Sequence, residues 1–314
     1  MKTPLVILTG PTAVGKTELS INLAKRINGE IISADSMQVY KRMDIGTAKI
    51  KKEEMQSVPH HLIDILEPAE EFNVVKFQEY ARKAMEQIYA KGRIPIIVGG
   101  TGFYIQSVLY SIDFKENHEN TTYRKELEEL AIEKGPLFLH EELKNIDEES
   151  ANSIHPNNVK RVIRAIEYYK QTGLKISEHN EEQKQKESPY NFCYFVLNNK
   201  REILYDRINK RIDKMLNEGL IEEVQKLLHE GCTKEMVSMQ GLGYKEIISY
   251  LQEENTLEEA VYLLKRDTRH FAKRQLTWFK REKDVTWIEK NEYEDNEEKI
   301  LDTLIHILKI KKII

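Results

Sequence analysis

The 314-residue sequence has few cysteines, no long apolar run and little net charge. Its two cysteines, Cys193 and Cys232, lie far apart and form no C-x-x-C pair, which argues against a disulfide scaffold or a zinc site. No apolar stretch approaches the roughly 18 residues of a membrane helix, and the N-terminus leads straight into a predicted strand. We therefore expect no membrane span, no signal or transit peptide, and a cytoplasmic location.

The overall composition is that of an ordinary globular protein. Hydrophobic residues make up 40% and charged residues 32% of the chain, and the net charge is −4. This charge argues against a generally basic nucleic-acid-binding surface, although it leaves room for a local basic patch. The length suits one large α/β domain, or a domain with an insertion.

A glycine-rich motif near the N-terminus predicts a phosphate-binding loop. Residues 10–17 fit G-x-x-x-x-G-K-[ST] between an apolar, strand-like run at 5–8 and a helix-like pattern at 19–27. In such a loop the backbone N–H groups surround a phosphate, Lys16 adds positive charge, and the Thr17 hydroxyl can hold Mg²⁺. A glycine turn that merely caps a helix would leave Lys16 and Thr17 unexplained. The predicted phosphate site consists of Gly10, Pro11, Thr12, Ala13, Val14, Gly15, Lys16 and Thr17.

Two further predicted strands end in residues suited to chemistry. Residues 30–34 form a short apolar run that ends at Asp35, and residues 94–98 lead into a G-G-T-G turn containing Thr101. The carboxyl ends of parallel strands face the ligand crevice, so Asp35 should lie beside the phosphate loop if the first two strands are neighbours. A typical P-loop ATPase has an acid after the third strand, where this chain has glycines and a hydroxyl. The alternatives are a helix cap for Asp35 and tight packing for the glycines.

The middle of the chain changes character. Strand patterns disappear from about residue 115 to 189, and highly charged helical segments take their place. We predict a discontinuous P-loop α/β core domain, residues 1–115 and 190–314, with an all-helical insertion domain at 116–189. Residues 178–187 are polar throughout and read as a flexible return to the core. The paired His60 and His61 suit a structural role better than a metal site, because adjacent side chains diverge.

Basic residues gather in two later segments. Arg207 and Arg211 are four apart on a predicted helix and could close over a diphosphate. Residues 265–283 carry eight Lys or Arg against two acids, with aromatic residues between them. Charge and aromatics on one helix suit a nucleic-acid backbone with bases that stack. The alternative is a solvated face over a core of Phe271 and Trp278.

Together these motifs resemble the IPP transferase family of bacterial tRNA dimethylallyltransferases. The matching segments follow the family's order along nearly the whole chain. They are GPTAVGKT at 10–17, ADSMQVY at 34–40, PHHLID at 59–64, GGTGFY at 99–104, GYKE at 243–246 and AKRQLTWF at 272–279. One departure is Lys160, where Gln is common before the Arg-x-x-Arg of the insertion.

The resemblance implies an α/β fold of the P-loop NTPase kind and a specific reaction. The dimethylallyl group of dimethylallyl diphosphate would pass to N6 of the adenosine at position 37 of tRNA, 3′ to the anticodon. It implies Mg²⁺ at Thr17 as cofactor, the anticodon stem-loop as partner, no membrane partner, and a monomer. Asp35 would accept the N6 proton, and Thr101 would hold the base or a diphosphate oxygen. The implied tRNA contacts are Asp35, Ser36, Met37, Gln38, Thr101, Arg124, Lys160, Arg161, Arg164, Lys273 and Arg274.

Two other functions fit part of the sequence. A small-molecule kinase of the shikimate or nucleotide kinase kind would explain the first hundred residues, but neither the charged insertion nor the basic aromatic helix. A non-catalytic RNA-binding protein gated by ATP would explain the basic helix, but not Asp35 and Thr101 at converging strand ends.

Overall fold

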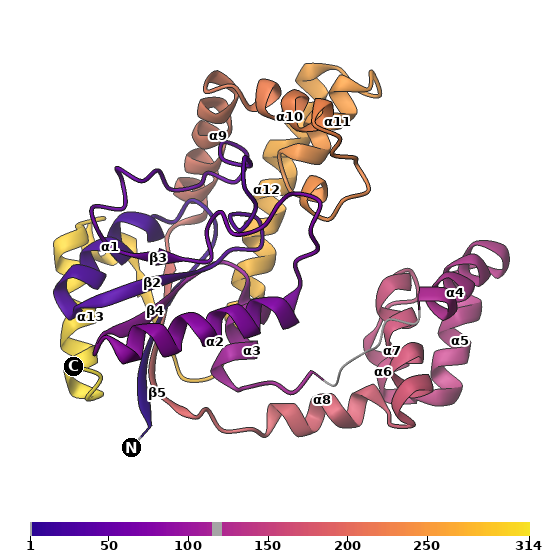
Figure 1. The fold of residues 1–314 in the computed structure, drawn as a ribbon, viewed down its shortest axis with the longest axis horizontal. Coiled ribbons are helices and arrows are strands. Elements are labelled where there is room, and N and C mark those ends of the chain that lie inside the picture. The colour runs from indigo at the N-terminus through magenta and orange to yellow at the C-terminus, as the bar shows by residue number, and fades with distance from the viewer. Residues whose placement is uncertain (1, 115–120) are drawn as a thin grey trace. The chain divides into compact units, whose positions relative to one another are not determined.

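The computed structural model describes residues 2–114 and 121–314. It divides into two compact units, Met1–Leu109 with Pro189–Ile314 and Tyr110–Ser188 (Figure 1). The sequence placed the first boundary at residues 115 and 116, which lie outside the described residues.

The larger unit is built on one parallel sheet of six strands in the order β3-β2-β4-β1-β5-β6. All five neighbouring pairs are parallel. The apolar runs at β1, β2, β4 and β5 are almost entirely buried, as expected for parallel strands covered by helices on both faces. The mixed α/β fold with a parallel sheet is therefore confirmed. The strands are β1 (Thr3–Thr9), β2 (Gly29–Ala34), β3 (His60–His61), β4 (Ile94–Gly99), β5 (Tyr190–Asn198) and β6 (Val285–Glu289).

The first two strands are not neighbours, so the condition set for Asp35 is not met directly, because β4 lies between them. Gly99 at the end of β4 pairs with Thr9 on one side and with Ala34 on the other. A Cβ atom at Gly99 would lie 2.3 Å from the carbonyl oxygen of Ala34, so this alignment requires glycine. The three strands therefore end at one level, and the turn that follows β4 lies between the phosphate loop and Asp35.

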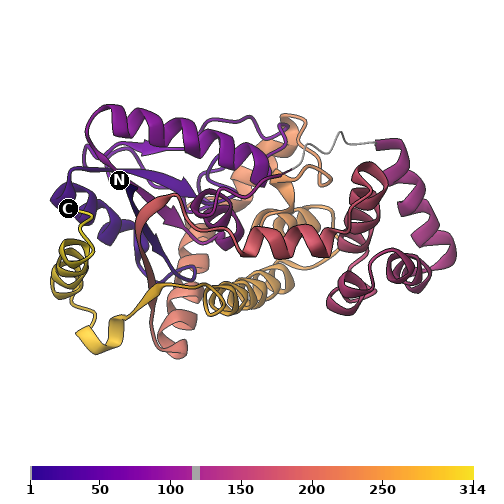
Figure 2. The ribbon, with the colours of Figure 1, turned by 90° about the horizontal axis from the view of Figure 1, so that it is seen from below.

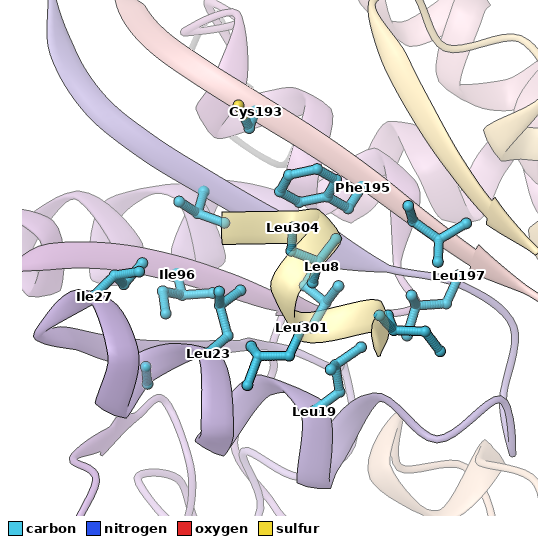
Figure 3. Packing of buried hydrophobic residues seen from close by; sticks show 14 of the residues in the cluster. Leu8, Leu19, Leu23, Ile27, Ile96, Cys193, Phe195, Leu197, Leu301 and Leu304 are labelled. Atoms are coloured by element: carbon cyan, nitrogen blue, oxygen red, sulfur yellow. The ribbon is translucent and has the colours of Figure 1, made fainter. Parts of the chain in front are cut away.

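Helices cover both faces of this sheet. Figure 2 shows α2 on one side and α13 on the other. On the α13 side, α1 joins it to form a core with residues of β1, β4 and β5 (Figure 3). The helices of this unit are α1 (Lys16–Ile27), α2 (Val74–Ala90), α3 (Gly102–Leu109), α9 (Arg201–Asn217), α10 (Leu220–His229), α11 (Tyr244–Leu251), α12 (Leu257–Phe279) and α13 (Glu297–Ile310), with short 3₁₀ helices at Ser238–Gln240 and Lys290–Tyr293.

The smaller unit is helical throughout its described part and has a core of its own. Apolar side chains such as Leu143 of α5 and Val162 of α7 are fully buried there. Its helices are α4 (Thr121–Lys134), α5 (Pro136–Ile146), α6 (Glu148–Ser153), α7 (Val159–Thr172) and α8 (Ile176–Lys184). No helix within residues 2–114 and 121–314 combines the length and the apolar character that crossing a membrane needs.

The flexible return expected at 178–187 is wrong, because most of it belongs to α8. Ser177, in the first turn of this helix, donates backbone and hydroxyl hydrogen bonds to the buried carboxylate of Asp147. Gln183 near its end accepts a hydrogen bond from the backbone N–H of Asp113 at 3.0 Å. Polar anchors that are distant in sequence thus hold a segment whose composition alone suggested a loop.

The paired histidines support the edge of the sheet. His60 Nδ1 lies 2.8 Å from the carbonyl oxygen of Val58, and His61 Nε2 lies 2.7 Å from the carboxylate of Glu30. Glu30 is fully buried and also binds Lys91 and Arg93. Burial opposes ionisation of Glu30, but the hydrogen bonds from His61, Lys91 and Arg93 outweigh it and hold its pKa below the usual range. Both histidines therefore have structural contacts.

We predict that Glu30→Gln destabilises the protein by about 2 kcal/mol at neutral pH, because a buried carboxylate with three partners is lost. A depressed folded-state pKa gives stability that is present above the unfolded pKa and is lost as pH falls through the folded value. The gap between wild type and variant in urea unfolding should therefore shrink below about pH 4. Glu79→Gln, which removes an exposed pair with Lys83, is the control and should change little. A gap that does not depend on pH would contradict this account.

Candidate functional site

The phosphate loop between β1 and α1 has a backbone that only glycine permits at two positions. Gly10 has φ of +146°, and a Cβ atom there would lie 2.4 Å from the carbonyl oxygen of Leu197. Gly15 has φ of +92°, and a Cβ atom there would lie 2.9 Å from Lys290 Nζ. Strand β5 and the segment after β6 therefore support the loop from behind.

Lys16 bends back across the loop to which it belongs. Its Nζ donates to the carbonyl oxygens of Gly10 at 2.9 Å and of Pro11 at 2.8 Å. Burial, together with the charge of Arg211, lowers the pKa of Lys16 to about 7, while the charge of Asp35 acts in the opposite direction. A phosphate anion would favour the charged form of this lysine.

Of the two predicted diphosphate-binding arginines, the structure brings Arg211 to the loop. Its Nη1 lies 3.5 Å from Thr12 Oγ1, and burial lowers the pKa of its guanidinium while Asp35 raises it. Arg207, one turn earlier on α9, instead pairs with Asp295 at 3.4 Å. The spacing of four residues placed both arginines on α9 but could not identify the partner of each.

Asp35 follows the last residue of β2, as predicted. Its Oδ1 accepts hydrogen bonds from the backbone N–H groups of Met37 at 2.8 Å and Gln38 at 3.3 Å. The helix-cap alternative is wrong, because no helix begins in residues 35–48, and Asp35 instead caps a turn through one oxygen only. Among residues 2–114 and 121–314, no group hydrogen-bonds to Oδ2, so this oxygen can meet a substrate. Ser36 follows in the same turn and is partly buried.

The turn after β4 is packed tightly against α12. A Cβ atom at Gly100 would lie 2.0 Å from Gln275 Nε2, and one at Gly102 would lie 2.1 Å from Trp278 Cδ1. Thr101 donates its backbone N–H to Ala34, while its hydroxyl has no hydrogen-bond partner in the described part of the chain. The tight-packing interpretation of the glycines therefore applies, and their close approach to a ligand stays a prediction.

Gln275 joins the two glycine-rich loops and was missed as a site residue. Its Oε1 accepts from the backbone N–H of Thr12 at 2.9 Å, and its Nε2 donates to the carbonyl oxygen of Gly100 at 3.0 Å. It is 94% buried, since its relative exposure is 6%. The only signal in the sequence was its place in the segment 272–279, because nothing local identifies partners more than 170 residues away.

The basic side chains of α12 border an open hollow of about 430 Å³. Lys273 and Arg274 are exposed, and the Arg274 guanidinium lies 5.8 Å from the Phe271 ring. Trp278 packs edge-on against Phe103, with ring centroids 6.0 Å apart. The hollow is lined by His270, Lys273, Arg274, Thr277, Trp278 and Arg281.

In the helical unit, α7 presents a basic face. Lys160, Arg161 and Arg164 are all exposed on it. Arg124 of α4 differs from them, because its guanidinium forms an ion pair at 2.8 Å with Glu167, whose side chain is almost fully buried. Arg124 therefore helps to hold α4 on α7.

The residues beside the phosphate loop suit a hard cation bound partly through phosphate. Within residues 2–114 and 121–314, no cluster of three or more His, Cys, Asp or Glu side chains could hold a metal. Thr17 is exposed, and its hydroxyl makes no hydrogen bond to any described residue. A single hydroxyl fits Mg²⁺, which takes oxygen ligands, keeps several waters and commonly binds phosphate oxygens.

Known sequences of one family match nearly the whole chain. The model of the IPP transferase family matches residues 38–282. A tRNA dimethylallyltransferase of Lachnoclostridium phytofermentans is 65% identical over 311 residues, which are 99% of each chain. One of Acetivibrio thermocellus is 53% identical over 304 residues, which are 97% of each chain.

Solved structures of the same kind of enzyme also resemble this chain. The full-length tRNA isopentenylpyrophosphate transferase of Bacillus halodurans is 46% identical, with a TM-score of 0.74 over 99% of this chain and 98% of its own. A eukaryotic dimethylallyltransferase acting on tRNA is 31% identical, with a TM-score of 0.83 over 99% of this chain and 80% of its own. These relatives support the predicted transferase and not the kinase alternative. The chain belongs to the IPP transferase family.

Proposed function

We propose that this protein transfers the dimethylallyl group of dimethylallyl diphosphate to N6 of the adenosine at position 37 of tRNA, giving N6-isopentenyladenosine and diphosphate. The names of its relatives support the reaction. The observation that carries the proposal is geometric. Arg211 reaches the phosphate loop at Thr12, and Lys16 and Asp35 follow strands that end at one level of the sheet. The turn after β4 supplies Thr101 in place of the acid that an ATPase would use.

The phosphate loop would act on the leaving group. As the bond between the allylic carbon and the diphosphate oxygen breaks, the electron pair stays on the diphosphate. Lys16, Arg211 and the loop N–H groups neutralise the charge that develops there, which lowers the barrier. Mg²⁺ held by the Thr17 hydroxyl would add to this neutralisation. Arg207 would assist only after release from Asp295.

Asp35 would act on the nucleophile. The lone pair of adenine N6 is delocalised into the ring, so N6 attacks the allylic carbon well only when a base accepts its proton. Oδ2 of Asp35 is available for that proton, while Oδ1 keeps the carboxylate oriented through Met37 and Gln38. The Thr101 hydroxyl would hold the adenine or a diphosphate oxygen.

The RNA would be held by basic side chains on both units. An adenosine in the anticodon loop must leave its stack to reach a strand-end crevice. Lys273 and Arg274 on α12, and Lys160, Arg161 and Arg164 on α7, suit phosphate contacts, and Ser36, Met37 and Gln38 suit contacts with bases. Arg124, predicted to bind phosphate, would act chiefly by holding α7 through Glu167. We also propose that the enzyme is cytoplasmic and monomeric.

The direct test is incubation of the purified protein with Mg²⁺, an unmodified anticodon stem-loop RNA and radiolabelled dimethylallyl diphosphate. We expect label in the RNA and release of one diphosphate per transfer, and no consumption of ATP in a parallel assay. RNA without an adenosine at position 37 is the control. ATP hydrolysis without labelled RNA would instead support a kinase.

Asp35→Asn should lower kcat at least about 100-fold, the lower end of the range for loss of a general base. The amide oxygen can still accept from Met37 and Gln38, so the turn should persist and the Kd of the donor should stay within about threefold. Asp206→Asn, which removes an exposed acid paired with Lys210, is the matched control. Full activity of Asp35→Asn would end the assigned role.

Binding of the donor should take up a proton at Lys16. Its pKa of about 7 in the free protein should rise when diphosphate stabilises the charged form. Affinity should therefore fall as pH rises above 7, by up to tenfold per pH unit. Titration calorimetry near pH 8 in two buffers of different ionisation enthalpy measures this uptake. Lys16→Arg stays charged and should abolish it, whereas wild type without uptake would contradict the assignment.

A further inference from the structure

The segment that follows β2, residues 35–48, carries the proposed base and the proposed base-reading side chains but contains no long helix or strand. We call it the recognition segment. Its two halves are joined by Gln38, whose Nε2 donates to the carbonyl oxygens of Thr47 at 3.3 Å and Ala48 at 3.4 Å. A shift of the second half therefore moves the Gln38 side chain.

A carboxylate from a distant helix holds the second half. Glu223 of α10 accepts three successive backbone N–H groups, from Asp44 at 2.9 Å, Ile45 at 2.7 Å and Gly46 at 3.0 Å. Its Oε1 also accepts the hydroxyl of Tyr244 at 2.7 Å. Successive N–H groups around one anion form a strong, directional site, and here a side chain of the same protein fills it.

The contact surface between this segment and α10 and α11 is tightly fitted. Tyr244 is fully buried, and a Cβ atom at Gly46 would lie 2.6 Å from its ring. A Cβ atom at Gly241, in the turn before α11, would lie 2.5 Å from the Cε of Met37. The glycine turn before α11 therefore packs against a residue proposed to read bases.

The recognition segment also has support that does not come from α10, through Lys49, the residue that follows it. The Lys49 side chain, 4% exposed, donates to the carbonyl oxygen of Tyr40 at 2.6 Å and binds Asp44 Oδ1 at 2.7 Å. Arg42 of the segment also pairs with Glu230 at the end of α10 at 3.1 Å. Loss of Glu223 should therefore loosen the segment from α10 without unfolding it.

We propose that Glu223, oriented by Tyr244, is a positioning residue that sets the register of the recognition segment and thereby the choice of bases beside the target adenosine. The hydrogen bonds of Glu223 involve neither the phosphate loop nor Asp35. The inference rests on the proposed function, because it assigns to Met37 and Gln38 a contact with single-stranded loop bases.

The test compares Glu223→Gln with Glu222→Gln, the exposed neighbour on the same helix. The substrates are two anticodon stem-loops, one natural and one with the base next to the adenosine replaced. Glu223→Gln should raise KM for the natural RNA about tenfold and reduce the ratio of kcat/KM between the two RNAs about tenfold. Its kcat at saturating RNA and its KM for dimethylallyl diphosphate should stay within about threefold. Glu222→Gln should match wild type.

Tyr244→Phe removes one donor to Glu223 while keeping the ring, and it should produce the same pattern at smaller size. This variant decides the matter if Glu223→Gln fails to fold. If kcat falls and the KM values for RNA and for dimethylallyl diphosphate both rise by similar factors as thermal stability falls, the role of Glu223 is structural. That result would overturn the inference. The inference would also be overturned if the Glu223→Gln enzyme had the same kcat and KM values as Glu222→Gln. Wild type that labels neither RNA would instead refute the proposed function, and the inference with it.

Discussion

Two partly buried cations beside one loop are the constraint on which the proposed site depends. Lys16 and Arg211 lie close enough for the charge of Arg211 to lower the pKa of Lys16, and Asp35 is the acid that acts in the opposite direction on both. Such an arrangement is unfavourable by itself and becomes favourable when an anion binds between the cations. The best occupant carries concentrated negative charge, as a departing diphosphate does. Asp35, which favours the charged form of both cations, is also the residue that we propose as the base, through the oxygen that no described residue hydrogen-bonds.

Strand register and glycine bring these groups together. Thr9, Gly99 and Ala34 lie at one level of the sheet, so three loops begin side by side. Late elements of the chain then fix those loops in place. Gln275 of α12 bridges the phosphate loop to the turn after β4, and Glu223 of α10 holds the loop after β2. The phosphate loop and the proposed catalytic residues Asp35 and Thr101 come from the first 101 residues, and Arg211 comes from α9. Helices from the last hundred residues hold the loops in place.

Local pattern was enough to predict the parallel sheet, the phosphate loop and Asp35 at a strand end, because each has a short-range signature in glycine spacing or apolar runs. It was not enough to predict that β4 separates β1 from β2, since strand order is decided by pairing across long stretches of chain. For the same reason, the sequence could not identify the partners of Arg207 and Glu223. A helix pattern shows which face a charge occupies, whereas its partner comes from another part of the fold. The α8 helix was missed because its anchors, Asp147 and Asp113, lie outside it.

We propose that diphosphate and adenine meet between the phosphate loop and Asp35. A crystal structure with an unreactive thio analogue of dimethylallyl diphosphate and an anticodon stem-loop tests this arrangement. We expect diphosphate oxygens in hydrogen-bond contact with Lys16 Nζ and Arg211, and adenine N6 within about 3.2 Å of Asp35 Oδ2. A diphosphate bound away from residues 10–17, or an adenine whose N6 faces away from Asp35, would contradict it.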